Sequence, residues 1–68
     1  MNKSATSKEA LLEIARDISY REGISKVSIR RLASESGVAI GTVYNYYPSK
    51  ADLVAEIMED FWRNVFHG

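Results

Sequence analysis

The fold of this chain is decided by the stretch Gly37-Val38-Ala39-Ile40-Gly41-Thr42-Val43-Tyr44-Asn45-Tyr46-Tyr47-Pro48-Ser49-Lys50. At about 100° per residue, a short helix within this stretch places Val43 and Tyr47 on one face, with Ile40 beside them. The opposite and flanking positions are small, polar or phenolic: Gly41, Thr42, Tyr44, Asn45 and Tyr46. The stretch therefore predicts an amphipathic helix whose outer face carries hydrogen-bonding groups in place of the usual long charged side chains.

This outer face has the chemistry that a DNA duplex requires. Hydroxyls and phenols donate to phosphate oxygens, an amide such as that of Asn45 pairs bidentately with adenine, and Gly41 permits a close approach. The alternative is a helix that only faces solvent, which three tyrosines within four residues fit poorly. The pattern favours contact with nucleic acid.

A second short helix is predicted immediately before, over residues 29–36. Ser28 can accept hydrogen bonds from the free N–H groups at its start, and its apolar residues Ile29, Leu32 and Ala33 share one face. Gly37 stands where a left-handed turn must end the helix, and a Cβ there would strain the turn. Two short helices joined by a glycine turn are the sequence form of a helix-turn-helix.

The run from Val27 to Leu53 closely resembles the DNA-binding domain of TetR-type (tetracycline-repressor-like) transcriptional regulators. The specific positions of this resemblance are Gly37-Val38, Gly41-Thr42-Val43-Tyr44, Tyr46-Tyr47-Pro48-Ser49-Lys50 and Leu53. With the upstream residues 11–23 included, the resemblance covers most of the chain. It implies an all-α fold, in which a three-helix DNA-binding domain is followed by a fourth, connecting helix.

The resemblance also implies roles for individual residues, with the helix after Gly37 entering the major groove. Phosphate contacts are expected from Ser28, Thr42, Tyr44 and Lys50, and contacts to bases or sugars from Arg30, Ile40, Gly41, Asn45 and Tyr46. The full regulator would be a ligand-responsive repressor that binds double-stranded DNA, at a palindromic operator, as a homodimer. Its small-molecule effector would bind a larger helical domain that is absent from this chain.

Four positions depart from the usual pattern of that family: Ser19 stands where Phe is common, Val27 where Thr is frequent, Arg31 where an acidic residue is frequent, and Ala39 where Ser or Thr is usual. Ser19 removes apolar volume, which Tyr20 or Ile24 is expected to refill. Ala39 leaves the following helix without a side-chain cap, at a cost of about 1 kcal/mol.

The charge of the chain is zero overall but unevenly distributed. Through residue 50 there are eight basic and five acidic side chains, and from residue 51 there are four acidic and one basic. Such polarity turns one end toward phosphates, although random asymmetry of this size is common in a short chain. A phosphate contact from Lys3 or Lys8 is the weaker expectation, because charged N-terminal tails are usually only solvated.

Two further helices are predicted on either side of the helix-turn-helix. Over residues 7–22, Leu11, Ile14, Ala15 and Ile18 repeat at helical spacing, and Gly23 is the stop signal. Over about residues 49–66, Pro48 ends the preceding helix and Ser49 with Asp52 resembles a capping box. Lys50 then lies in a first turn, where the helix dipole disfavours a cation. A nearby phosphate would favour it there; the alternative is an exposed lysine with a small penalty.

The last helix carries an apolar stripe that is wider than a small core needs. We expect the core to be closed by Leu53, Ile57 and Phe61. Trp62 and the residues that follow it are expected to form a second surface. The other trailing apolar residues are Val65 and Phe66. This stripe supports the alternative function, a small helical protein-interaction module.

Composition excludes several other classes. The chain of 68 residues is one small domain; it has no Cys, and His67 is its only His. No catalytic set of nucleophile, base and orienting group is recognisable, so we expect no enzyme activity, cofactor or metal. There is no apolar run that could span a bilayer and no signal region, which predicts a cytoplasmic, nucleoid-associated protein.

Overall fold

The computed structural model describes the backbone of residues 7–67 and the side chains of residues 7–65. The elements follow in the order α1 (Lys8–Glu22), the 3₁₀ turn η1 (Ile24–Lys26), α2 (Ile29–Ser36), α3 (Ile40–Tyr46) and α4 (Lys50–His67). The described part contains helices and no strand, which confirms the all-α expectation. The short turn η1 was not predicted.

Serine hydroxyls cap both α1 and α2; the cap of α2 was predicted from the sequence, and that of α1 was not. The hydroxyl of Ser7 accepts from the N–H of Ala10 at 3.1 Å, and that of Ser28 accepts from the N–H of Arg31 at 3.0 Å. At the end of α2, Gly37 adopts the left-handed conformation with φ 78° and ψ 13°. Its N–H donates to the carbonyl of Ala33 at 3.0 Å, which closes the helix.

One hydrophobic core joins the helices, with α2 packed on α1 and α3, and α4 packed on α1. Its members come from every helix and from the turn before α2: Leu11, Ala15, Ile18, Val27, Ile29, Leu32, Ala33, Val43, Tyr47, Leu53 and Ile57. Leu53 and Ile57 close the core as expected. The expectation for Phe61 is wrong: this side chain is exposed, because the core ends one helical turn earlier, at Ile57.

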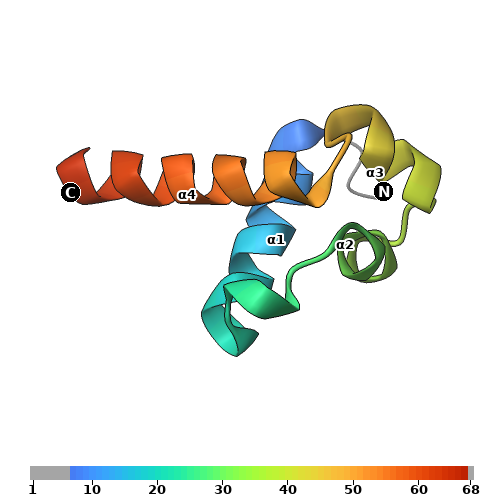
Figure 1. Cartoon of the computed structure of the whole chain (residues 1–68), viewed down its shortest axis with the longest axis horizontal. Coiled ribbons are helices and arrows are strands. Elements are labelled where there is room, and N and C mark those ends of the chain that lie inside the picture. Colours follow the sequence, from blue (N-terminus) through green and yellow to red (C-terminus); the bar gives the residue numbers. More distant parts are fainter. Residues whose placement is uncertain (1–6, 68) are drawn as a thin grey trace.

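The outer part of α4 extends away from the other helices (Figure 1). At its start, the Ser49 hydroxyl accepts from the N–H of Asp52 at 3.3 Å and donates to the Asp52 carboxylate at 2.9 Å. Its far end and α3 lie at opposite ends of the long axis of the molecule, which measures 33 Å (Figure 1). Surfaces on these two ends are therefore available to different partners.

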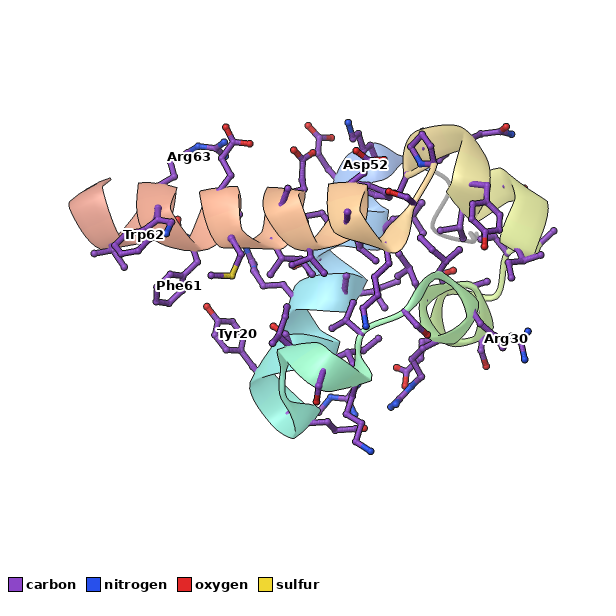
Figure 2. The ribbon with its side chains drawn as sticks, in the orientation of Figure 1. Tyr20, Arg30, Asp52, Phe61, Trp62 and Arg63 are labelled. Carbon is purple, nitrogen blue, oxygen red and sulfur yellow. The ribbon has the colours of Figure 1, made fainter. Side chains whose placement is uncertain are left out.

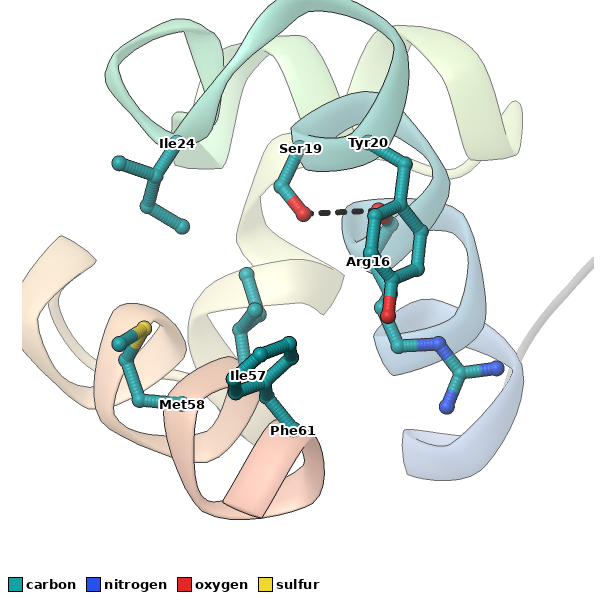
Figure 3. A pocket seen from close by; sticks show the side chains of 7 residues that line it. All are labelled: Arg16, Ser19, Tyr20, Ile24, Ile57, Met58 and Phe61. Atoms are coloured by element: carbon teal, nitrogen blue, oxygen red, sulfur yellow. Dashed lines mark hydrogen bonds between the residues drawn. The ribbon is translucent and has the colours of Figure 1, made fainter. Parts of the chain in front are cut away.

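The volume missing at Ser19 remains open, so the expectation that Tyr20 or Ile24 refills it is wrong. A hollow of about 210 Å³ lies between α1, η1 and α4. Tyr20 and Ile24 stand at its edge (Figure 3), and 67% and 40% of their surfaces are exposed. The remaining lining residues are Arg16, Ser19, Ile57, Met58 and Phe61. The Ser19 hydroxyl already has a hydrogen-bond partner within the chain, because it donates to the carbonyl of Arg16 at 2.8 Å.

Candidate nucleic-acid interface

Helix α3 is anchored mainly by two buried side chains. Val43 is fully buried, and Tyr47, the residue that caps the helix, is 1% exposed. Ala39 makes no side-chain hydrogen bond at the start of the helix, as predicted. Since the anchors are on one face, the opposite face of α3, with Gly41, Tyr44 and Asn45, is exposed.

The residues that sequence analysis assigned to DNA lie on three consecutive segments: the start of α2, the whole of α3 and the first turn of α4. Most of them are exposed, namely Arg30, Ile40, Gly41, Tyr44, Asn45 and Lys50. Three are half-buried, namely Ser28, Thr42 and Tyr46. Tyr46 packs against the core, so only part of its ring faces outward. Ile40, which the helical pattern placed beside the inner face, is 42% exposed.

Ser28 can still donate one hydrogen bond. Its oxygen accepts from the N–H of Arg31 as the cap of α2, which leaves the hydroxyl proton available to a phosphate oxygen. The neighbouring Arg30 points from α2 away from α1 (Figure 2). The start of α2 therefore offers a neutral donor and a guanidinium side by side, and both suit a phosphate or a base edge.

Gly41 is not required by the packing of the domain. A Cβ built at this position meets nothing within 4 Å, and the residue has no positive φ. A glycine inside a helix costs about 1 kcal/mol relative to alanine. A glycine at this position therefore carries that cost without a packing reason among the described residues.

The basic side chains among residues 7–65 divide into two groups. Five are neutralised by carboxylates of the same chain: Lys8, Arg16, Arg21, Arg31 and Arg63. Three form no ion pair: Lys26, Arg30 and Lys50. Two of these three, Arg30 and Lys50, are residues that the sequence assigned to DNA. The basic side chains without an ion pair are thus concentrated around the helix-turn-helix, where phosphates could supply their counter-charge.

Lys26 is a candidate that sequence analysis missed. It lies in η1, just before α2, and is exposed. Nothing in the sequence distinguishes it, because Glu22 stands four residues earlier and reads as its partner. In the structure Arg31 forms the hydrogen bonds to that carboxylate, and the charge of Lys26 acts on it without an ion pair.

The expected phosphate contact from the N-terminal segment finds less support. Lys8 is paired with Glu56 at 3.5 Å, and its ammonium lies 5.4 Å from the centre of the Tyr47 ring. Both interactions would be lost or weakened if Lys8 turned toward DNA. Lys3 lies outside the described residues, as do the side chains of Phe66 and His67.

Tyr47 differs from the other tyrosines of this stretch. Burial, together with the negative charge of Glu56, raises the pKa of its phenol to about 12, so the group is neutral at physiological pH. Its hydroxyl is buried without a hydrogen-bond partner. Tyr47 therefore belongs to the core, and the phenol of Tyr44 is the one that is exposed on α3.

Other kinds of site are not found among the described residues. Within residues 7–67, the described Asp and Glu side chains form no group arranged to hold a metal ion. No helix in the same range is long and apolar enough to cross a membrane.

Comparison with known proteins gives a consistent result for this fold. The family model of bacterial regulatory proteins, tetR family, matches residues 11–57. The HTH-type transcriptional regulator LuxR of Vibrio harveyi is 37% identical over 51 residues, which are 75% of this chain and 25% of that protein. An HTH-type transcriptional regulator of Staphylococcus aureus (strain USA300) is 32% identical over 60 residues, 87% of this chain and 32% of the relative.

The chain thus spans between a quarter and a third of the length of these relatives. No solved structure matches it significantly. The family match covers both helices of the helix-turn-helix and the part of α4 that closes the core. This chain belongs to the tetR family of bacterial regulatory proteins.

Proposed function

We propose that this chain binds double-stranded DNA in a sequence-specific manner, with α3 in the major groove of an operator half-site. One observation carries the proposal: Arg30 and Lys50, which form no ion pair with the described residues, come from the segments before and after a helix that exposes the amide of Asn45, the phenol of Tyr44, Gly41 and the apolar Ile40. Elsewhere in the described chain, the basic side chains other than Lys26 are neutralised internally. Phosphates supply the counter-charge that these cations lack.

The residues divide into two roles within this proposal. Lys50, Ser28, Tyr44 and Thr42 hold the DNA backbone, and Lys26 adds a charge beside them. Arg30 and Asn45 contact base edges, with Ile40 and Gly41 at the closest approach and Tyr46 at a base or sugar. Lys50 is exposed in the first turn of α4, where the helix dipole disfavours it, and a phosphate offsets this penalty.

As part of a longer regulator, the domain would act as a homodimer on a palindromic operator and repress transcription. A small-molecule effector would bind a separate domain and change the spacing of the two helix-turn-helix units. The relatives named as transcriptional regulators, which are several times longer than this chain, support this part of the proposal.

The test is a selection of bound sequences from random duplexes, followed by binding measurements at several salt concentrations. We expect one enriched half-site, and an affinity that falls steeply with salt because counterions are released from the phosphates. Failure to enrich any sequence, together with binding that does not respond to salt, would contradict the proposal.

A second candidate function rests on the outer half of α4. Met58, Phe61, Trp62 and Val65 are all exposed, by 42–52% of their surfaces. Such a face suits an apolar helix of another protein. Docking of this kind would respond little to salt, so the same titration distinguishes it from DNA binding.

A further inference from the structure

A cluster of charged side chains joins the end of α1 to α2 on the surface of the domain. Arg31 of α2 donates to both carboxylate oxygens of Glu22, from Nη1 at 3.0 Å and from Nη2 at 2.6 Å. Its Nε donates to Glu35 at 2.9 Å. Arg21 bonds to the other oxygen of Glu35 at 3.2 Å and to Asp17 at 2.8 Å. We call the three residues Arg31, Glu22 and Glu35 the Arg31 clasp.

The geometry of the clasp is of the strong kind. Isolated surface ion pairs contribute little, but two parallel hydrogen bonds from a guanidinium to one carboxylate add energy and fix orientation. The hydrogen bonds from Arg31 hold the pKa of Glu22 below its ordinary value, with the charge of Arg21 adding to the effect. Glu22 is therefore ionised at neutral pH. All three nitrogen groups of Arg31 are occupied.

Arg30 and Arg31 are adjacent in sequence but differ in state. Arg30 is exposed and forms no ion pair, whereas the charge of Arg31 is consumed by two carboxylates. The backbone N–H of Arg31 also donates to the hydroxyl of Ser28, which caps α2. The same residue therefore bonds to α1 through its side chain and to the cap of α2 through its backbone. Arg31 therefore connects the end of α1 to the residues that begin α2.

We infer that Arg31 is a positioning residue for DNA binding, because its fork on Glu22 holds the start of α2, with Ser28 and Arg30, in the orientation that meets the duplex. This inference rests on the proposed function. α2 has only eight residues, and a helix so short depends on tertiary contacts for its stability and direction. The core fixes its inner face, and the clasp holds the side toward α1.

For one variant, the change in net charge alone predicts an effect on DNA affinity opposite to that of our inference. This variant therefore tests the inference directly. Glu22→Gln removes a negative charge from a protein that binds a polyanion, so Coulomb attraction alone would tighten binding. Our inference is that the variant binds its preferred duplex about threefold to tenfold more weakly, since the fork is broken. Glu13→Gln is the matched control: Glu13 is also exposed on α1 and forms no ion pair. It should bind as tightly as the parent or slightly more tightly.

A second variant separates the fork from the charge. Arg31→Lys keeps the positive charge but cannot form two parallel bonds, so it should lose about as much affinity as Glu22→Gln. Arg31→Gln, which removes the charge, should leave the slope of log affinity against log salt unchanged, because Arg31 does not touch phosphate in this inference. The double variant Glu22→Gln/Arg31→Lys should be no weaker than either single variant.

The outcomes are read against the parent chain, with circular dichroism confirming that each variant is folded. If the parent binds DNA and Glu22→Gln binds as tightly as Glu13→Gln, or if Arg31→Lys keeps parental affinity, the positioning role is overturned while the proposed function stands. A shallower salt slope in Arg31→Gln would instead make Arg31 a phosphate contact. If the parent itself binds no duplex at low salt, both the proposed function and the inference fail.

Discussion

The two ends of this domain both expose aromatic side chains, yet the groups around those side chains differ in charge and polarity. At the helix-turn-helix, Tyr44 is exposed next to Asn45 in α3, and the segments before and after α3 carry Arg30 and Lys50, which form no ion pair with the described residues. On the outer half of α4, Phe61 and Trp62 meet edge to face at 5.9 Å, on the side of the helix opposite Arg63 (Figure 2). Arg63 is paired with Asp60 at 3.8 Å. Free charge with hydrogen-bonding groups marks one end, and neutralised charge with apolar rings marks the other.

This difference teaches that overall charge is a poor guide to the interface of so small a protein. The chain has nine basic and nine acidic side chains, and its net charge is zero. What distinguishes the two ends is which charges are already satisfied within the fold. Four predictions test this contrast, and they run from the largest expected effect to the smallest.

The turn between α2 and α3 should be the most sensitive position at the helix-turn-helix end. Gly37→Val should cost about 1–3 kcal/mol of unfolding free energy and misplace α3, because a β-branched residue is strained at φ 78°. Beyond the two neighbouring residues in the chain, the new Cβ meets no described atom within 4 Å, so the penalty is conformational. Thermal unfolding and DNA binding measure both effects.

Gly41→Ala is the control for this prediction. It also removes a glycine, but from a helical position, so it should stabilise the fold by up to about 1 kcal/mol while weakening DNA binding through its new methyl group. Unfolding midpoints and DNA affinities of Gly37→Val equal to those of the parent would show that the turn is assigned wrongly.

Asn45 and Lys50 should separate the reading of bases from the holding of phosphates. Asn45→Ala should cost about 1–3 kcal/mol on the preferred site and flatten discrimination at one base pair per half-site, with the salt slope nearly intact. Lys50→Ala should reduce that slope by about one unit and weaken all duplexes alike. Equal weakening by Asn45→Ala on every sequence would make it a backbone contact, and an unchanged slope for Lys50→Ala would remove Lys50 from the interface.

The hollow at Ser19 should accept a larger side chain without effect on the DNA-facing end. Ser19→Phe should raise the unfolding free energy by about 0.5–2 kcal/mol, since a ring fills open space between α1 and α4. Ser25→Phe, at an exposed position of η1, should bring no such gain. Denaturant unfolding measures the difference. A Ser19→Phe variant less stable than its parent would mean that the hollow is too shallow for the ring.

The outer half of α4 should be the most tolerant region. Trp62→Gln and Val65→Gln should change the unfolding free energy by no more than about 0.5 kcal/mol and raise solubility, because both residues are 52% exposed. Ile57→Gln, one helical turn before the exposed part and 3% exposed, should unfold the domain. A large loss of stability in Trp62→Gln would assign that ring to the core, and sedimentation would show whether self-association has fallen.

Local signals explain why helix boundaries were predictable from the sequence. The bounds of α2 follow from a serine cap and a left-handed glycine, and both act within a few residues. The inner face of α3 follows from helical periodicity, as the burial of Val43 and Tyr47 confirms. The roles of individual residues in DNA binding remain predictions, because docking depends on a partner that the chain alone does not contain.

The ion pairs and the edge of the hydrophobic core could not be predicted from the sequence in the same way. The partner of Glu22 is Arg31, nine residues away, and the partner of Arg16 is Asp60, forty-four residues away. Periodicity placed Phe61 in the core, but the core ends at Ile57, and only the crossing of α1 and α4 decides where that edge lies.

The sequence by itself therefore determined the elements of this protein, because caps, turns and apolar spacing act between near neighbours along the chain. Which cations remain free for DNA, which are consumed within the fold, and whether a missing side chain is refilled were decided only by the tertiary structure. These properties depend on distances between helices. An arginine is left available for DNA, or is paired within the fold, according to whether the fold places a carboxylate beside it.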